Sequence, residues 1–150
     1  MRLWHKDMIH VLPEKQLLGQ WREVCLIARA INRGNLNHVL VNKVKDYDPE
    51  HLYAYGALVY HEMVKRDYKA VFDRFAQYFP AHIDSDVCPV TRSKLYDGWH
   101  NDRYLRQCYA NLEEKYDCGG VPDDEWRVVA DFYNKWLHKR FEARRKELER

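Results

Sequence analysis

Apolar residues recur at helical spacing in four stretches of the chain, and each stretch is bounded by residues that start or stop a helix. The clearest stretch begins at Pro13, which suits a first helical turn, and ends near Gly34, a typical C-terminal cap. Its apolar side chains follow at steps of three and four residues: Leu17, Trp21, Val24, Ala28 and Ile31. This period predicts an amphipathic α-helix with one buried face.

Three further segments have the same pattern. Asp48 and Pro49 form an N-cap and a first turn for a second helix, whose apolar line we expect to continue through Phe72 and Phe75 to Pro80. A third helix is predicted at about 102–116, and a fourth begins near Pro122 with a buried stripe made of Trp126, Val129, Phe132, Tyr133 and Trp136. We interpret segments 36–47 and 81–100 as ordered loops, because a short strand at 38–44 would have no partner.

These segments predict an all-α fold: a single compact domain over residues 1–150, with about four main helices and long ordered loops. The composition, 46% hydrophobic and 32% charged, is that of a globular protein. No apolar run approaches the roughly 18 residues that span a bilayer, and the first residues lack an apolar signal core, so we expect a cytoplasmic protein without membrane contact. The cysteines and histidines lack metal-ligand spacing, so we expect reduced thiols and no metal.

The charges are unevenly distributed, although the net charge is only +2. Residues 1–46 hold eight Lys and Arg against four Asp and Glu, and residues 135–146 hold six basic residues against one acidic residue. Two basic ends are compatible with a phosphate-facing surface, and equally with two solvated helix faces. Charge alone favours the second interpretation.

One face of the first predicted helix carries polar side chains beside the apolar stripe: Gln16, Gln20 and Glu23, with Gly19 among them. A Gly inside a helix costs about 1 kcal/mol relative to Ala, which indicates a close approach by another helix or by a ligand. The two amides suit a polar ligand edge or simple solvent exposure. Neither Arg22 nor Glu23 has an oppositely charged residue four positions away, so both are available to a partner outside the helix.

The N-terminal amine is a candidate nucleophile. An α-amine has a pKa of about 7.7–8.0, so roughly a tenth of it is unprotonated at neutral pH and able to form a Schiff base. We expect Met1 to be retained before the bulky Arg2, and apolar residues such as Leu3, Trp4 and Met8 to hold this segment against the core. Lys6 and Lys15 are the alternative amines.

The residues Leu12, Leu17 and Trp21-Arg22-Glu23, placed after a short basic N-terminal segment, resemble the pyrimidine-dimer DNA glycosylase family of the phage endonuclease V type. The start Met1-Arg2-Leu3-Trp4-His5 is similar to a bacterial branch of that family. The resemblance implies an all-α, endonuclease V-like domain. Such a domain attacks C1′ of a damaged nucleotide with its N-terminal amine and then nicks the strand by β-elimination.

Carried onto this sequence, the resemblance implies Met1 and Glu23 as catalytic residues, with no cofactor and no metal. The DNA-binding residues expected from the resemblance and from the pattern of polar and basic side chains are Arg2, Gln16, Gln20, Arg22, Arg29, Lys43 and Lys45. We expect the protein to be a monomer. Its expected partner is duplex DNA that contains an abasic or damaged nucleotide, such as a pyrimidine dimer. A non-catalytic DNA-binding protein and a helical protein-interaction domain remain open as alternatives.

Overall fold

The computed structural model describes residues 2–35, 37–83 and 90–150, so the predicted nucleophile Met1 lies outside the described residues. The described residues form helices and contain no strand, which confirms the predicted all-α fold. The elements, in chain order, are η1 (Lys6–Val11), α1 (Glu14–Asn32), α2 (Val39–Lys45), α3 (Pro49–Lys65), α4 (Asp73–Ala76), α5 (Asp102–Asp117) and α6 (Asp123–Leu148).

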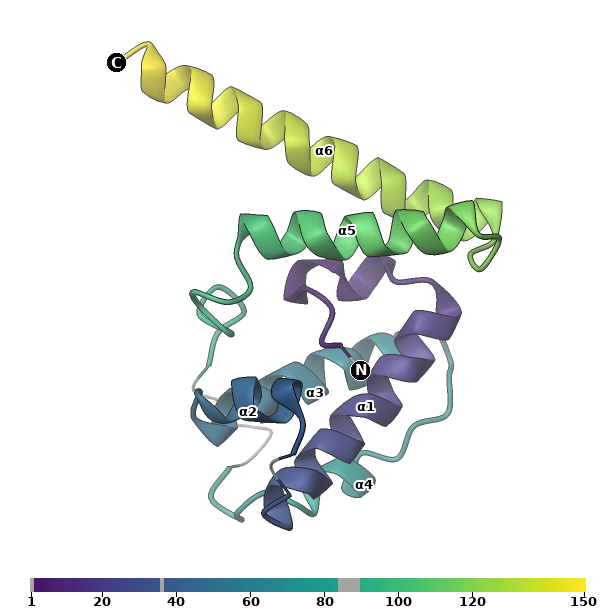
Figure 1. The fold of residues 1–150 in the computed structure, drawn as a ribbon, viewed down its shortest axis with the longest axis vertical. Helices are drawn as coiled ribbons and strands as arrows, with labels where there is room; N and C mark the ends of the chain where they lie inside the picture. Colours follow the sequence, from purple (N-terminus) through teal and green to yellow (C-terminus); the bar gives the residue numbers. More distant parts are fainter. Residues whose placement is uncertain (1, 36, 84–89) are drawn as a thin grey trace.

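The helices form two parts joined by the N-terminal segment. Helices α1 and α3 pack against each other, with α2 and α4 against α1. Helix α5 crosses above them, α6 lies along α5, and η1 lies between α5 and the α1–α3 pair (Figure 1). The first described residues therefore lie in the middle of the molecule, between α1 and α5 (Figure 1).

The N-terminal segment is part of the hydrophobic core. Leu3, Met8, Ile9 and Leu12 are almost completely buried, and they pack with the inner side chains of α1, α3 and α5, among them Leu17, Val24, Ile27, Tyr55, Val59 and Leu105. Burying apolar side chains stabilises the fold by roughly 1.5–3 kcal/mol each. The expectation that the first residues are held against the core is therefore confirmed.

Segment 36–47 is not the ordered loop that we predicted, because it contains helix α2. Nδ1 of His38 accepts the backbone N–H of Leu40 at 3.1 Å and so caps the helix. Val41 and Val44, three residues apart, are both buried on its inner face. The alternation of apolar residues in this segment obscured the helical spacing of Val41 and Val44. A helix of only seven residues is stable here because these two valines pack against the core.

The predicted continuation of the second helix as far as Pro80 is also wrong. Helix α3 ends at Lys65, and Asp67 adopts a left-handed conformation with φ of 60° that turns the chain away. The short helix α4 then brings Phe75 back onto α3, directly over Gly56. A Cβ atom at position 56 would lie 2.2 Å from Cζ of Phe75, so the ring occupies space that only a glycine leaves open.

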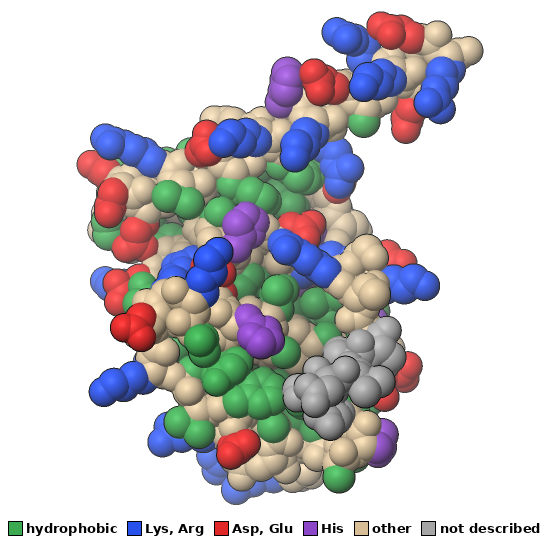
Figure 2. All heavy atoms as spheres, turned by 180° about the vertical axis from the view of Figure 1, so that it is seen from behind, with side chains coloured by type: hydrophobic (Ala, Val, Ile, Leu, Met, Phe, Trp, Pro, Cys, Tyr) green, Lys and Arg blue, Asp and Glu red, His purple; other side chains and the backbone are tan. Residues whose placement is uncertain are grey.

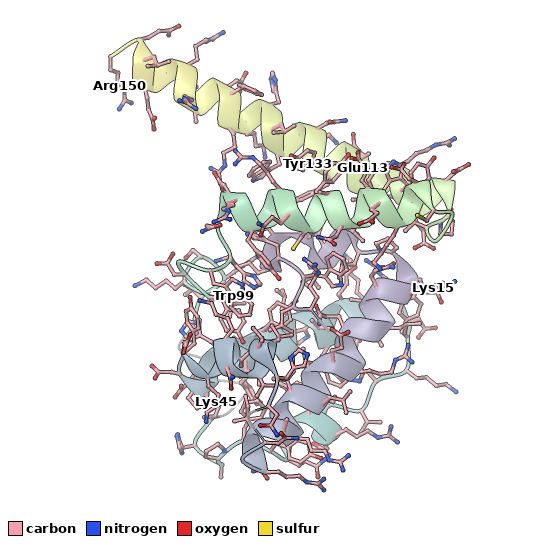
Figure 3. The ribbon with its side chains drawn as sticks, in the orientation of Figure 1. Lys15, Lys45, Trp99, Glu113, Tyr133 and Arg150 are labelled. Atoms are coloured by element: carbon pink, nitrogen blue, oxygen red, sulfur yellow. The ribbon has the colours of Figure 1, made fainter. Side chains whose placement is uncertain are left out.

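Helix α6 packs on α5 along the predicted stripe, but the rings of this stripe are stacked and half-buried rather than buried. The rings of Tyr109 and Tyr133 stack at 3.7 Å with an interplanar angle of 6°, and Tyr133 lies between the two helices (Figure 3). Only Val129 of α6 is fully buried. The last part of α6 projects beyond α5, is exposed from 138 onward and carries charged side chains of both signs (Figure 2).

Candidate functional site

Glu23 of α1 lies beside the start of the chain. Its side chain is half-buried, and Oε2 accepts the backbone N–H of Arg2 at 3.0 Å. Arg2 itself is half-buried, and its guanidinium carbon lies 5.3 Å from the ring centroid of Trp4, within the range of a cation–π contact. The first described residue is thus fixed at a carboxylate, with a cationic side chain close to it.

Gln20 holds this arrangement together from within α1. Its side chain is only 1% exposed, and Oε1 accepts the backbone N–H of Trp4 at 2.7 Å. Nε2 donates to the carbonyl oxygen of Arg2 at 2.8 Å and lies 3.4 Å from Oε2 of Glu23. Both ends of one amide are therefore used to align the N-terminal segment along the helix.

Two tyrosines complete the support of residues 2–4. The hydroxyl of Tyr55 lies 2.6 Å from the carbonyl oxygen of Trp4 and 2.8 Å from Oε1 of Gln20, so its single proton is shared between two acceptors. The hydroxyl of Tyr104 in α5 donates to the carbonyl oxygen of Leu3. Burial raises the pKa of both phenols well above the usual value, which keeps both hydroxyls protonated as donors.

Lys6 anchors the next part of the segment to the loop before α5. Its Nζ donates to the carbonyl oxygens of Ser93 at 3.1 Å and Leu95 at 2.8 Å, and its backbone N–H donates to Nδ1 of His100 at 2.9 Å. Burial lowers the pKa of Lys6, although Asp7 and Asp97 act in the opposite direction. Because its amine is buried and donates two hydrogen bonds, Lys6 is a structural anchor. Lys15, in contrast, is exposed near the start of α1 (Figure 3).

Gly19 and Gln16 lie on the same face of α1 as the site. A Cβ at position 19 would meet no heavy atom within 4 Å, so no other described part of the chain packs against this glycine. The sequence left two reasons for a glycine inside this helix, namely a close approach by another helix or by a ligand. Packing by another described helix is therefore not the reason. Oε1 of Gln16 is buried and has no hydrogen-bond partner among the described residues.

The other predicted DNA-binding residues lie around the site rather than in it. Arg22 is exposed, points along α1 with its Nε 3.4 Å from the carbonyl oxygen of Leu18, and faces α4 together with Arg29. Lys43 and Lys45 are exposed on α2, and Nζ of Lys43 lies 5.9 Å from the ring centroid of Trp99. Trp99 lies in the loop before α5, on the same side of the molecule as Lys45 (Figure 3). The structure thus joins Arg2, Gln20 and Glu23 directly and leaves the remaining cations at the periphery.

Sequence reasoning did not identify Tyr55 and Tyr104 as part of the site. Their partners are backbone carbonyls 51 and 101 residues away in the sequence, and no local pattern marks such a bond. It identified Gln20 for a ligand edge, whereas both polar atoms of this amide are engaged inside the protein. The spacing that placed Gln20 and Glu23 on one face was the available signal.

No group of three or more His, Cys, Asp or Glu side chains in residues 2–35, 37–83 and 90–150 is placed to hold a metal ion. Among the same residues, no helix is both long and apolar enough to cross a membrane.

These features define a small helical protein whose N-terminal segment is fixed against a carboxylate on its first long helix. The family model described as pyrimidine dimer DNA glycosylase matches residues 1–74, which include Arg2, Gln20, Glu23 and Tyr55. Through this N-terminal half the chain belongs to that family of DNA-repair glycosylases, and its substrate class is DNA. No curated protein and no solved structure matches the chain.

Proposed function

We propose that this protein is a DNA glycosylase with abasic-site lyase activity, in which the amino group of residue 1 is the nucleophile and Glu23 is the catalytic carboxylate. The observation that carries the proposal is the hydrogen bond of 3.0 Å from the Arg2 backbone N–H to Oε2 of Glu23. Three covalent bonds separate the nitrogens of two successive residues. An amine on residue 1 is therefore within roughly 7 Å of that oxygen in any conformation of the first residue.

This separation suits a reaction at one sugar carbon. The amine attacks C1′ while the bond to the base breaks and the base leaves with the electron pair, so positive charge develops on the sugar. The nitrogen then loses a proton and the C1′–O4′ bond opens, with O4′ protonated, which gives the imine. A carboxylate on the opposite side of the sugar stabilises that charge, and it accepts the C2′ proton when the 3′ phosphate leaves in β-elimination. Glu23 is the acidic side chain that the described site places next to the start of the chain.

The surrounding residues support this chemistry in two ways. Gln20, Tyr55 and Tyr104 hold the backbone of residues 2–4, so the reacting groups meet without a further ordering cost. We assign Gln20 to positioning rather than to DNA contact, because its amide atoms are engaged within the protein. We also assign Arg2, Gln16, Lys43 and Lys45 to DNA contact, because an Arg guanidinium can hold a phosphate bidentately and both lysines are exposed on α2.

Trapping of the imine tests the proposal. The untagged protein, with an intact mass that includes Met1, is incubated with abasic-site duplex DNA and borohydride, and the adduct is located by peptide mass mapping. We expect a covalent adduct on the N-terminal peptide and none after selective N-terminal acetylation. An adduct on Lys15, or DNA binding without any adduct, would overturn the assignment; the second outcome would favour the non-catalytic DNA-binding protein.

Glu23→Gln separates the role of the carboxylate from that of the amine. The amide keeps the size of the side chain and an acceptor for the Arg2 N–H, but it neither stabilises a cation nor takes up a proton. Strand cleavage at saturating DNA is therefore expected to slow by about 100-fold or more, with little change in DNA affinity. Glu14→Gln, an exposed change at the start of the same helix, is the matched control and is expected to leave the rate unchanged.

A further inference from the structure

Two adjoining grooves run along the flank of α1 that faces α4, away from Glu23. They have volumes of about 430 and 510 Å³ and share Trp21, Arg22 and Arg74 in their walls. Their floor is apolar, since Trp21 and Met63 are buried there. No part of the site described above uses these grooves.

The rim of the two grooves is basic. Arg22 and Arg29 of α1 form one side, Arg74 of α4 and Lys69 form the other, and no carboxylate lines either groove. Among the described residues, none of these four cations takes part in an ion pair. Like charges held around one groove repel each other, so a bound anion would relieve a cost that the free protein carries.

The wall opposite α1 is fixed by packing. Phe75, which follows Arg74, is fully buried over Gly56 and contacts the ring of Trp21 with 5.9 Å between centroids. Arg74 is thereby held at a defined place even though its side chain is exposed. Arg74 also acts electrostatically across the groove. Burial raises the pKa of Cys25 on α1, and the positive charge of Arg74 partly offsets this rise.

The dimensions of the rim suit a chain of phosphates better than a single anion. Arg22 and Arg29 are seven residues apart, which is about 10 Å along a helix. One strand of B-DNA advances by about 3.4 Å per phosphate, so this length faces roughly three phosphates. Arg22 also precedes Glu23 directly, which places the groove about 100° around α1 from the carboxylate, since a helix has 3.6 residues per turn.

We propose that this groove binds the phosphate backbone of the DNA next to the reacting nucleotide, and that Arg74 and Lys69 form its second wall. The identity of the polyanion rests on the proposed function, whereas the groove and its charge do not. The projecting end of α6 is a weaker candidate for the same role, because its Arg140 and Arg145 already take part in ion pairs, with Asp102 and Glu149 respectively.

Salt dependence of DNA binding tests the proposal. Affinity for a duplex with a non-cleavable abasic analogue is measured by fluorescence anisotropy between 50 and 250 mM salt. Each lost phosphate contact reduces the magnitude of the negative slope of log K against log salt by about 0.9, so Lys69→Ala/Arg74→Ala is expected to reduce this magnitude by close to 2. Arg74→Lys, which keeps the charge, is expected to keep the slope.

A matched control is Arg127→Ala, an exposed cation in the first part of α6, which Figure 1 shows at the other end of the molecule from α4. It removes one positive charge, whereas the double variant removes two, and it is expected to leave the slope unchanged. An unchanged slope in the double variant, or an equal change per removed charge in Arg127→Ala, would overturn the groove proposal. Imine trapping by the wild-type protein tests the nucleophile separately: a missing adduct overturns that assignment, whereas the salt slopes alone decide the groove, so a failed groove and a failed nucleophile give different results.

Discussion

At the scale of single residues, the site depends on how one buried amide is used. Gln20 accepts from the backbone of Trp4, donates to the backbone of Arg2 and lies next to the carboxylate of Glu23. A buried amide that meets a chain segment in this way fixes the register of that segment along the helix. Its loss would leave a backbone donor and a backbone acceptor without partners in the interior, where such groups are costly.

We therefore expect Gln20→Ala to lower the free energy of unfolding by about 1–3 kcal/mol, measured by urea denaturation. Gln107→Ala, which removes an exposed amide from α5, is the matched control and is expected to change it by no more than about 0.5 kcal/mol. Tyr55→Phe removes the hydroxyl that contacts the Trp4 carbonyl oxygen and is expected to cost about 1 kcal/mol. If Gln20→Ala were as mild as the control, the amide would not hold the N-terminal segment.

The sequence predicted part of this site because helical spacing is local. Residues 16, 19, 20 and 23 share a face by the geometry of any α-helix, and the apolar residues after Arg2 indicated that the segment would be buried. The direction of Arg22 and the contacts of Tyr104 depend on how distant helices pack, and spacing along the chain contains no information about that.

At the scale of secondary-structure elements, two glycines in long helices have opposite surroundings. Gly56 of α3 faces the ring of Phe75, whereas Gly19 of α1 faces open space. The first glycine allows α4 to pack against α3, and so it fixes the wall that carries Arg74. The second has no packing role among the described residues, which leaves its cost to helix stability uncompensated in the free protein.

Alanine substitutions are therefore expected to act in opposite directions. Gly56→Ala places a methyl group against a buried ring and is expected to lower the free energy of unfolding by about 1–3 kcal/mol. Gly19→Ala replaces a helical glycine without a clash and is expected to raise it by up to about 1 kcal/mol. Urea denaturation of the two variants checks both signs, and stabilisation by Gly56→Ala would show that Phe75 does not pack over α3 as described.

The helices that sequence analysis located well are those with long apolar lines and clear caps, such as α1, whose predicted limits agree with Glu14–Asn32. It missed α2 because seven residues give too few repeats to separate a helical pair of valines from an alternating pattern. It extended α3 too far because Phe72 and Phe75 continue the apolar spacing, although the left-handed Asp67 reverses the chain. Packing of the aromatic rings around Tyr53 and Trp21 decides that reversal, and it is a tertiary effect.

At the scale of the whole molecule, the two parts of the fold meet at a buried aromatic cluster behind the site. His5 of the N-terminal segment stacks on His100 with 5.2 Å between ring centroids, and His100 also contacts the rings of Tyr55, Tyr96 and Tyr104. Burial, together with the neighbouring His5 and Lys6, lowers the pKa of His100 to about 2. Burial also lowers the pKa of His5. The ring of His100 is therefore neutral in the folded protein at pH 5–8.

The stability of the fold should consequently fall in mild acid. Between pH 6.5, near the pKa of an unfolded histidine, and the much lower folded pKa of His100, the unfolded chain binds a proton that the folded chain does not. The free energy of unfolding therefore decreases as the pH falls, by about 1 kcal/mol per pH unit for this one group. His100→Asn keeps an acceptor for the Lys6 N–H, bonded to Nδ1 in the wild type, but does not titrate. Urea denaturation from pH 7.5 to 4.5 is expected to show a shallower pH dependence in this variant than in the wild type. Parallel curves would mean that His100 does not link proton uptake to the joining of the two parts.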